Sequence, residues 1–322
     1  MRRAVLLVAA AFALGGRADA GGMRARLAPP ARGLQVRLSH FDVRADTERE
    51  VCQRVTLPNR KPVDVQGLTI AMPSGSTWSS HHFAIFVPGD GGASASPEPV
   101  DSVGCLRQGG ELLSPILAFV QRSRQRIQFP AGVGFTLLAH QVLLLNSHYV
   151  NGGGSPVGPD VAINFRAARA GAIRHHVRSF QLGTVRIDVP AGAEASVDSS
   201  WTVPFAMNVV WLSSHSHKHT TAVTVDLVAA GTTVTDHDVV THDYAQPDFR
   251  YYPEPRRLEA GDQIRWTCRY RNTTPHRVTF GVTSEDEMCF AVGFFYPDDD
   301  AGPTPVVPRC ASGSAGLVCP VN

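Results

Sequence analysis

Residues 34–38 read Leu-Gln-Val-Arg-Leu, with an apolar side chain at every second position. Successive side chains of a β-strand point to opposite faces, so this alternation predicts a strand with one buried face. Gly, Pro, Asn and Asp separate further runs of this kind, at 65–70, 82–87, 135–145, 185–189, 203–212, 221–228 and 264–270. Only residues 111–120 have a helical pattern. We therefore expect an all-β protein built of antiparallel β-sandwiches.

The composition excludes two broad classes of protein. Of the 322 residues, 43% are hydrophobic and 18% are charged, which is enough apolar material for a core and excludes wholesale disorder. The net charge of +2 provides no electrostatic footprint for nucleic acid. We therefore expect no nucleic-acid partner.

The first twenty residues are typical of a signal peptide. Arg2 and Arg3 precede an apolar stretch at 4–14, and Ala18-Asp-Ala20 is a cleavage signal. An uncleaved membrane anchor is the alternative. No later segment has about 18 consecutive apolar residues, so we expect a secreted or periplasmic protein without membrane association after cleavage.

A loop rich in Gly and Pro divides the chain near its middle. Residues 151–159 read Asn-Gly-Gly-Gly-Ser-Pro-Val-Gly-Pro, and one more strand-like run follows at 161–165. We place the junction at 166–173. The predicted domains are two tandem β-sandwiches, at 31–167 and 172–300, and a tail at 301–322 rich in Pro, Gly and Ser.

The chain has six cysteines, an even number that suggests up to three disulfides in an oxidising compartment. None forms a C-x-x-C pair, which argues against a thiolate zinc site. Six cysteines allow 15 pairings. Proximity along the chain favours Cys52–Cys105, Cys268–Cys289 and Cys310–Cys319, and sequence alone does not choose among the pairings.

His215-Ser-His217 follows the strand-like run Met207 to Leu212. Residues i and i+2 of a strand share a face, so the two imidazoles can bind one ion without distorting the backbone. The same pattern is typical of a polar, solvent-exposed strand end. His219 is a third candidate on that face, and its role stays open.

Four more side chains are candidate ligands. Adjacent strand residues such as His81 and His82 face opposite sides, so both reach one metal only at a bend or bulge. His148 ends the apolar run 143–149, a position where a buried core histidine is also common. Met288 precedes Cys289, and its thioether is a soft ligand that favours Cu(I). A disulfide at Cys289 would hold Met288 in a fixed direction.

The spacing of these residues is more specific than any one of them. His82 and His148 are 66 residues apart, His148 and His215 are 67 apart, and His217 and Met288 are 71 apart. Over residues 34–297 the chain resembles the copper type II, ascorbate-dependent monooxygenases. The motifs that carry the resemblance are His81-His-Phe83, Leu145-Asn-Ser-His-Tyr149, His215-Ser-His217 and Asp286-Glu-Met-Cys289, with segments 130–135, 246–253 and 261–268 in the family's order.

The resemblance implies two jelly-roll-like β-sandwiches, each carrying one copper, that face each other across a solvent-filled cleft. It assigns the electron-transfer copper to His81, His82 and His148. It assigns the oxygen-activating copper, and with it the catalytic role, to His215, His217 and Met288. The implied reaction is hydroxylation of a C–H bond with O2, with ascorbate as the reductant. Cys52–Cys105 and Cys268–Cys289 correspond to family disulfides.

Four positions depart from the peptide-amidating members of the family. Ser213 replaces an arginine that anchors a peptide carboxylate, Phe290 and Val292 replace an asparagine and a tyrosine, and Asn146 replaces a glutamine. A buried carboxylate without a cationic partner is costly, so a peptide substrate does not fit. We expect these four residues to line a pocket for a small apolar or aromatic substrate.

Two other functions are compatible with the sequence. One is a non-catalytic, copper-binding secreted β-sandwich protein, and the other is a sandwich whose histidines have no metal role. Motifs for nucleotide binding or a serine nucleophile do not occur: the chain has no G-x-G-x-x-G after a strand, no P-loop and no G-x-S-x-G. The cofactors that the resemblance implies are two copper ions, with ascorbate as electron donor.

Overall fold

The computed structural model describes residues 23–88, 98–101, 116–229, 231–239, 244, 247–281, 283–298, 311–313 and 316–319. Within these residues every regular element is a β-strand, as expected. No described residue lies in a helix that could span a bilayer. The predicted signal peptide lies outside the described residues.

The helical pattern at 111–120 was misleading where the structure can test it. Strand β6 spans Ile116–Val120, and its residues alternate between buried and half-buried positions. Ile116, Ala118 and Val120 are the buried ones, so a period of two decides this segment.

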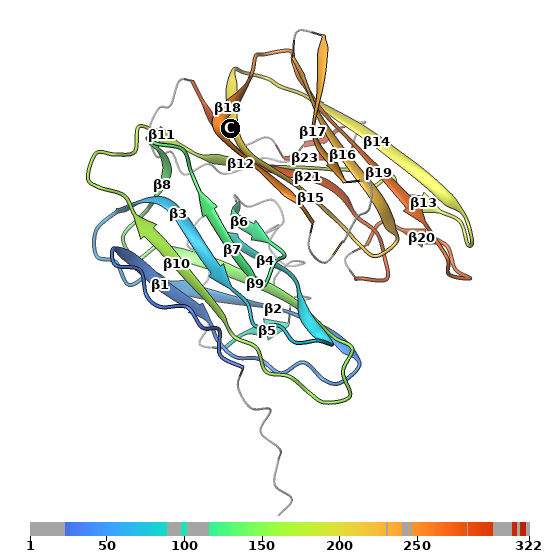
Figure 1. Ribbon diagram of the computed structural model, residues 1–322, viewed down its shortest axis with the longest axis horizontal. Helices are drawn as coiled ribbons and strands as arrows, with labels where there is room; N and C mark the ends of the chain where they lie inside the picture. The colour runs from blue at the N-terminus through green and yellow to red at the C-terminus, as the bar shows by residue number, and fades with distance from the viewer. Residues whose placement is uncertain are drawn as a thin grey trace, which may run out of the picture.

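Two sheets form the N-terminal half of the molecule (Figure 1). The first contains β1 (Gly33–Leu38), β10 (Val161–Ala167), β3 (Val63–Ala71), β8 (Val133–Leu137), β7 (Arg124–Gln128) and β11 (His175–His176). The second has the order β5 (Val100–Asp101), β2 (Thr47–Thr56), β9 (Val142–Asn151), β4 (Trp78–Phe86) and β6. All pairings are antiparallel except that of β11 with β8, which joins a strand beyond the predicted junction to the N-terminal half.

The C-terminal half also has two main sheets. One has the order β18 (Phe249–Leu258), β15 (Met207–Ser216), β21 (Cys289–Pro297), β12 (Arg178–Gly183), β23 (Gly316–Cys319) and β22 (Ala311–Gly313). The other has β14 (Glu194–Thr202), β19 (Gln263–Arg271), β16 (Thr220–Ala229) and β17 (Thr232–Val239), and a small pair joins β13 (Asp188–Val189) to β20 (Val278–Thr279). Part of the predicted tail thus forms the β22–β23 hairpin.

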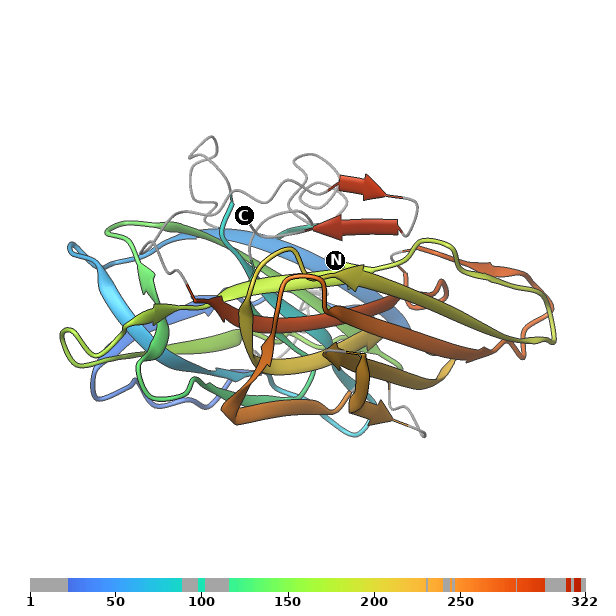
Figure 2. The same ribbon diagram turned by 90° about the horizontal axis from the view of Figure 1, so that it is seen from above.

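The two halves lie side by side in both views (Figures 1 and 2). Each half has its own apolar core, but β15 and β21 contribute to both. On β21, Ala291 and Phe295 pack into the C-terminal core, while alternate residues turn to the N-terminal core. We call the side chains that join the N-terminal core the shared apolar interface; they are Val210, Trp211, Val292 and Phe294.

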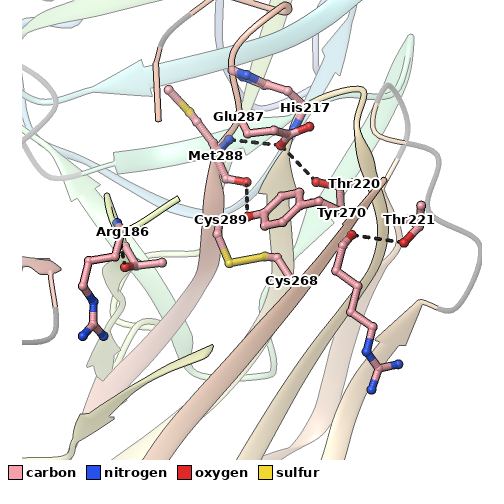
Figure 3. The surroundings of a disulfide bond; sticks show 11 residues. Arg186, His217, Thr220, Thr221, Cys268, Tyr270, Glu287, Met288 and Cys289 are labelled. Atoms are coloured by element: carbon pink, nitrogen blue, oxygen red, sulfur yellow. Dashed lines mark hydrogen bonds between the residues drawn. A yellow bond between two sulfur atoms is a disulfide. The ribbon is translucent and has the colours of Figure 1, made fainter. Parts of the chain in front are cut away.

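The predicted disulfide between Cys268 and Cys289 is present and joins β19 to β21 (Figure 3). It therefore links the two main sheets of the C-terminal half across their core. Cys52 on β2 is also disulfide-bonded. Its predicted partner Cys105, and Cys310, lie outside the described residues.

Candidate metal centre

His81, His82 and His148 come together through the pairing of β4 with β9. His82 is opposite His148, and the register shifts between Ser80 and His82. This irregularity is of the kind expected from the adjacent histidines, since a bulge lets both rings turn toward one place. The ring centres of His81 and His82 are 5.4 Å apart, and they lie 5.1 Å and 5.3 Å from that of His148.

Strand β15 presents the other two histidines. Alternation places His215 on the same face as Trp211, toward the N-terminal half. The ring centres of His215 and His217 are 5.3 Å apart. The β15–β21 pairing ends with Ser216 opposite Cys289. His217 comes directly after Ser216 and Met288 directly before Cys289, so both lie just beyond this end of the pairing. Met288 is half-buried, and Figure 3 shows its side chain pointing away from the disulfide.

The five rings form a single group, which we call the histidine cluster: His81, His82, His148, His215 and His217. His81 lies 5.5 Å from His215 and 5.2 Å from His217 between ring centres. One ring nitrogen from each of His81, His82 and His215 lies within 4.8 Å of the others. The histidines assigned to the two coppers thus adjoin, without the solvent-filled separation that the resemblance implies. The shared apolar interface explains this, because it packs the two halves directly together.

Four ring nitrogens in the cluster are buried without a hydrogen-bond partner. They are both nitrogens of His81, Nδ1 of His82 and Nδ1 of His148. Buried polar atoms are almost always paired, and each unpaired one costs about 1–3 kcal/mol. A neutral imidazole offers one lone pair to a metal, so one nitrogen each of His81, His82 and His148 fits copper, while the other nitrogen of His81 carries a proton.

Hydrogen bonds on the outer side of the N-terminal rings fix their orientation. His82 Nε2 lies 3.2 Å from Glu50 Oε1 and 2.9 Å from Asn146 Oδ1. His148 Nε2 lies 3.2 Å from Glu48 Oε2. A carboxylate only accepts, so each Nε2 carries the proton and each Nδ1 keeps a free lone pair toward the cluster.

The C-terminal rings have the opposite arrangement. His217 Nδ1 donates to the carbonyl oxygen of Asp286 over 3.1 Å. His215 Nδ1 donates to Oε1 of Gln121 over 3.2 Å, and the Gln121 amide donates to the carbonyl oxygen of Tyr244 over 2.6 Å. The His217 ring therefore keeps Nε2 as its lone-pair nitrogen, which can act as a ligand.

Burial sets the charge of the ligands. It lowers the pKa of His81 well below its usual range and lowers the pKa of His217 to about 4. These imidazoles are therefore neutral near pH 7, which is the form that binds metals. Hydrogen bonding from His148 holds the pKa of Glu48 at about 2. Burial raises the pKa of Glu50, but its interactions with His82 outweigh this effect and lower that pKa to about 2.

A buried glutamate organises the turn after β15. Glu287 is fully buried, and its carboxylate accepts the N–H groups of His217 and Met288 and the hydroxyl of Thr220 (Figure 3). It also accepts the N–H of His219. Burial raises the pKa of Glu287 to about 7, against the effect of these donors. Glu287 thus holds the backbone of residues 217–219 in place through hydrogen bonds.

Sequence reasoning missed four of these supporting residues: Glu48, Glu50, Gln121 and Glu287. Glu287 lies inside the quoted Asp286–Cys289 motif, and the spacing of Glu48 and Glu50 places them on one face of a strand. Nothing in the sequence indicates that β2 lies beside β9, or that Gln121 reaches His215.

The four residues predicted to line a substrate pocket have different surroundings. Asn146 is buried against Glu50, and the Ser213 hydroxyl donates to the Asp248 carbonyl oxygen. Val292 belongs to the shared apolar interface. Phe290 is half-buried, with its ring centre 6.5 Å from that of His215.

A pocket of about 760 Å³ lies elsewhere, along the first described residues of the chain. Its lining is Met23, Arg24, Ala25, Arg26, Leu27, Ala28, Arg37, Pro73, Ser74 and Trp78. It contains none of the predicted substrate or metal residues.

One family model matches a segment of the C-terminal half. Residues 195–312 match the copper type II ascorbate-dependent monooxygenase C-terminal domain. The match includes His215, His217 and Met288, and it confirms the predicted resemblance in this part of the chain. No curated protein matches the chain.

Solved structures give only weak likenesses. The major capsid protein P2 of bacteriophage PM2 has a TM-score of 0.33 and 10% identity, over 84% of this chain and 100% of that one. The PBCV-1 protein VP54, fitted into a reconstruction of the virophage Sputnik, has a TM-score of 0.25 and 8% identity, over 91% and 98%. An infectious bursal disease virus structure, of the Gt strain, has a TM-score of 0.21 and 9% identity, over 92% and 82%. Likenesses this weak support no inference about this chain.

Proposed function

We propose that this protein is an exported dicopper monooxygenase that hydroxylates a C–H bond of a small substrate with O2 and ascorbate. One observation carries the proposal: five buried imidazoles converge, and four of their nitrogens have no hydrogen-bond partner. Two of the five belong to the segment that matches the monooxygenase domain.

The chain's own residues have distinct roles in this proposal. His81, His82 and His148 hold the electron-transfer copper, and His215, His217 and Met288 hold the oxygen-activating copper. Bound copper supplies a centre that cycles between Cu(I) and Cu(II) and activates O2. Three imidazoles suit both oxidation states, whereas two imidazoles with a thioether favour Cu(I). Burial keeps His81 and His217 neutral near pH 7, and hydrogen bonds orient the rings of His148 and His217 before any metal arrives.

The surroundings of His215 favour an apolar substrate. The aromatic rings of Phe119 and Phe290 lie 5.0 Å and 6.5 Å from the imidazole, measured between ring centres. At Ser213 the side chain is a hydroxyl, which is already bonded to a carbonyl oxygen. A substrate carboxylate would find no cation at that position, so we propose a small apolar or aromatic molecule.

Copper analysis and O2 uptake test the function together. The proposal predicts two coppers per chain and O2 uptake that depends on ascorbate. Met288→Ala should abolish uptake while the protein remains folded. Met207→Leu is the matched control, because Met207 lies buried in the C-terminal core, away from the cluster.

Each outcome has a distinct meaning. Copper binding without ascorbate-dependent turnover would refute the monooxygenase proposal and support the non-catalytic copper-binding alternative. A wild-type chain that binds no copper would refute both. Turnover that survives Met288→Ala would show that the oxygen site has been assigned to the wrong residues.

Export has its own test. Expression with residues 1–20 in a bacterial host should deliver the chain to the periplasm or medium, with a new N-terminus near Gly21. A full-length chain retained in the membrane would favour the uncleaved anchor instead.

A further inference from the structure

Two carboxylates lie directly behind the N-terminal histidines. Glu48 and Glu50 are two residues apart on β2, so both face the same side of the sheet. The β2–β9 register sets Glu50 opposite His148. The Glu50 side chain is only 12% exposed and that of Glu48 is 28% exposed, so water screens their charges weakly.

Each carboxylate contacts a different ring. Glu50 Oε1 lies 3.2 Å from Nε2 of His82 and also accepts the Asn146 amide over 2.9 Å. Glu48 Oε2 lies 3.2 Å from Nε2 of His148. The contacted nitrogens are the outer ones, and the Nδ1 atoms of both rings are the buried, unpartnered ones.

We propose that Glu48 and Glu50 are positioning residues that turn His148 and His82 so that Nδ1 faces the metal, and that their charges make this site prefer Cu(II) over Cu(I). The inference rests on the proposed function, because it assigns these imidazoles to the electron-transfer copper. A carboxylate behind a ligating histidine fixes its tautomer and raises its basicity. Two such negative charges stabilise a dication more than a monocation at the same place.

Glu48 has a second contact that extends this role. Ser284 also lies beside the Glu48 carboxylate and helps to lower its pKa. Ser284 precedes Glu287 and Met288 in the loop before β21. Glu48 therefore joins a ligand of the N-terminal copper to the loop that carries a ligand of the other copper. Glu50 has no such contact among the interactions described for it, so the two residues can be separated by experiment.

The test uses Glu50→Gln and Glu48→Gln in the full-length chain. Glutamine keeps the size of the side chain and removes the charge. Cu(II) and Cu(I) are each titrated into the metal-free protein against a competing chelator, and the Cu(II) form is followed by electron paramagnetic resonance. Glu194→Gln is the matched control, since Glu194 pairs with Arg271 on the exposed surface of the other half.

We expect one of the two coppers to bind Cu(II) about 10–100-fold more weakly in Glu50→Gln, as for other lost contacts behind a ligand. Its Cu(I) affinity should fall less, so the Cu(II)/Cu(I) affinity ratio falls, and its resonance spectrum should change. The other copper should keep its affinity. Glu48→Gln should weaken the same copper and also alter the spectrum of the second, through Ser284.

Two results distinguish a failure of this inference from a failure of the proposed function. A wild-type chain that binds no copper refutes the proposed function. Wild-type binding of two coppers, with affinities and a Cu(II)/Cu(I) ratio unchanged in Glu50→Gln, refutes only the positioning role. Equal losses for both oxidation states would show that Glu50 has a structural role without the proposed charge effect.

Discussion

Glu287→Gln removes one acceptor from the turn after β15. Oε1 of Glu287 accepts the His219 N–H over 2.6 Å. Oε2 accepts the His217 N–H, the Thr220 hydroxyl and the Met288 N–H over 3.0, 3.0 and 3.2 Å. A glutamine has a single amide oxygen. With that oxygen at the three-donor position, its NH₂ group faces the N–H of His219, and one buried donor is left unpaired.

The size of the effect follows from that single loss. An unsatisfied buried donor costs about 1–3 kcal/mol. We therefore expect Glu287→Gln to reduce the free energy of unfolding by about 2 kcal/mol, and to lower Tm by roughly 4–8 °C. Glu287→Ala leaves all four donors without their acceptor and should lose more than about 4 kcal/mol, in the range of exceptional substitutions.

Thermal unfolding of the metal-free, full-length chain measures this directly by near-ultraviolet circular dichroism. Glu285→Gln is the control in the same loop, because Glu285 is exposed and pairs with Lys218 at the surface. That variant should stay within about 0.5 kcal/mol of wild type. If Glu287→Gln unfolds at the same Tm as wild type, the carboxylate of Glu287 does not stabilise the turn after β15 that carries His217.

Three further outcomes can be measured by urea unfolding of the metal-free chain. Loss of the Cys268–Cys289 disulfide, with both changed to alanine, should reduce stability by about 3 kcal/mol, because the sequence separation is 21 residues. Gly183→Ala should reduce it by about 1–3 kcal/mol, since a Cβ there would lie 2.2 Å from the Phe290 ring and displace it; unchanged stability would argue against this contact. The pKa of Glu50 is about 2 in the folded chain against an ordinary 4.5, so its contribution is present above pH 4.5 and is lost as pH falls toward 2. Between pH 4.5 and pH 2 the free energy of unfolding should therefore fall less in Glu50→Gln than in wild type. Parallel curves of unfolding free energy against pH would contradict the lowered pKa of Glu50.

The sequence predicted the fold class and the ligand candidates because both depend on local periodicity. Alternation identified strands such as 34–38, and the i, i+2 rule placed His215 and His217 on one face. The adjacent pair His81-His82 called for an irregular strand, and β4 has a register shift there. Residues 111–120 misled because a short apolar run fits both periods.

The supporting residues were beyond prediction because they depend on contacts between distant strands. Glu50 acts on His82 only because β2 and β4 flank β9 in one sheet, and that order is not written in any local pattern. Gln121 reaches His215 across the two halves, over 94 positions of sequence. The histidines of the two halves likewise lie close together because of how the halves pack, and the hydrophobic periodicity of the sequence gives no information on that packing.

The shared apolar interface also constrains how this molecule can be divided. Val210, Trp211, Val292 and Phe294 are each at most 4% exposed, and they owe this burial to packing against the N-terminal core. A fragment beginning at residue 172 would present an indole, a phenyl ring and two valines to water on one sheet face. Such a patch promotes self-association. Recombinant dissection of the C-terminal half would therefore call for polar replacements at those four positions before the fragment could stay in solution.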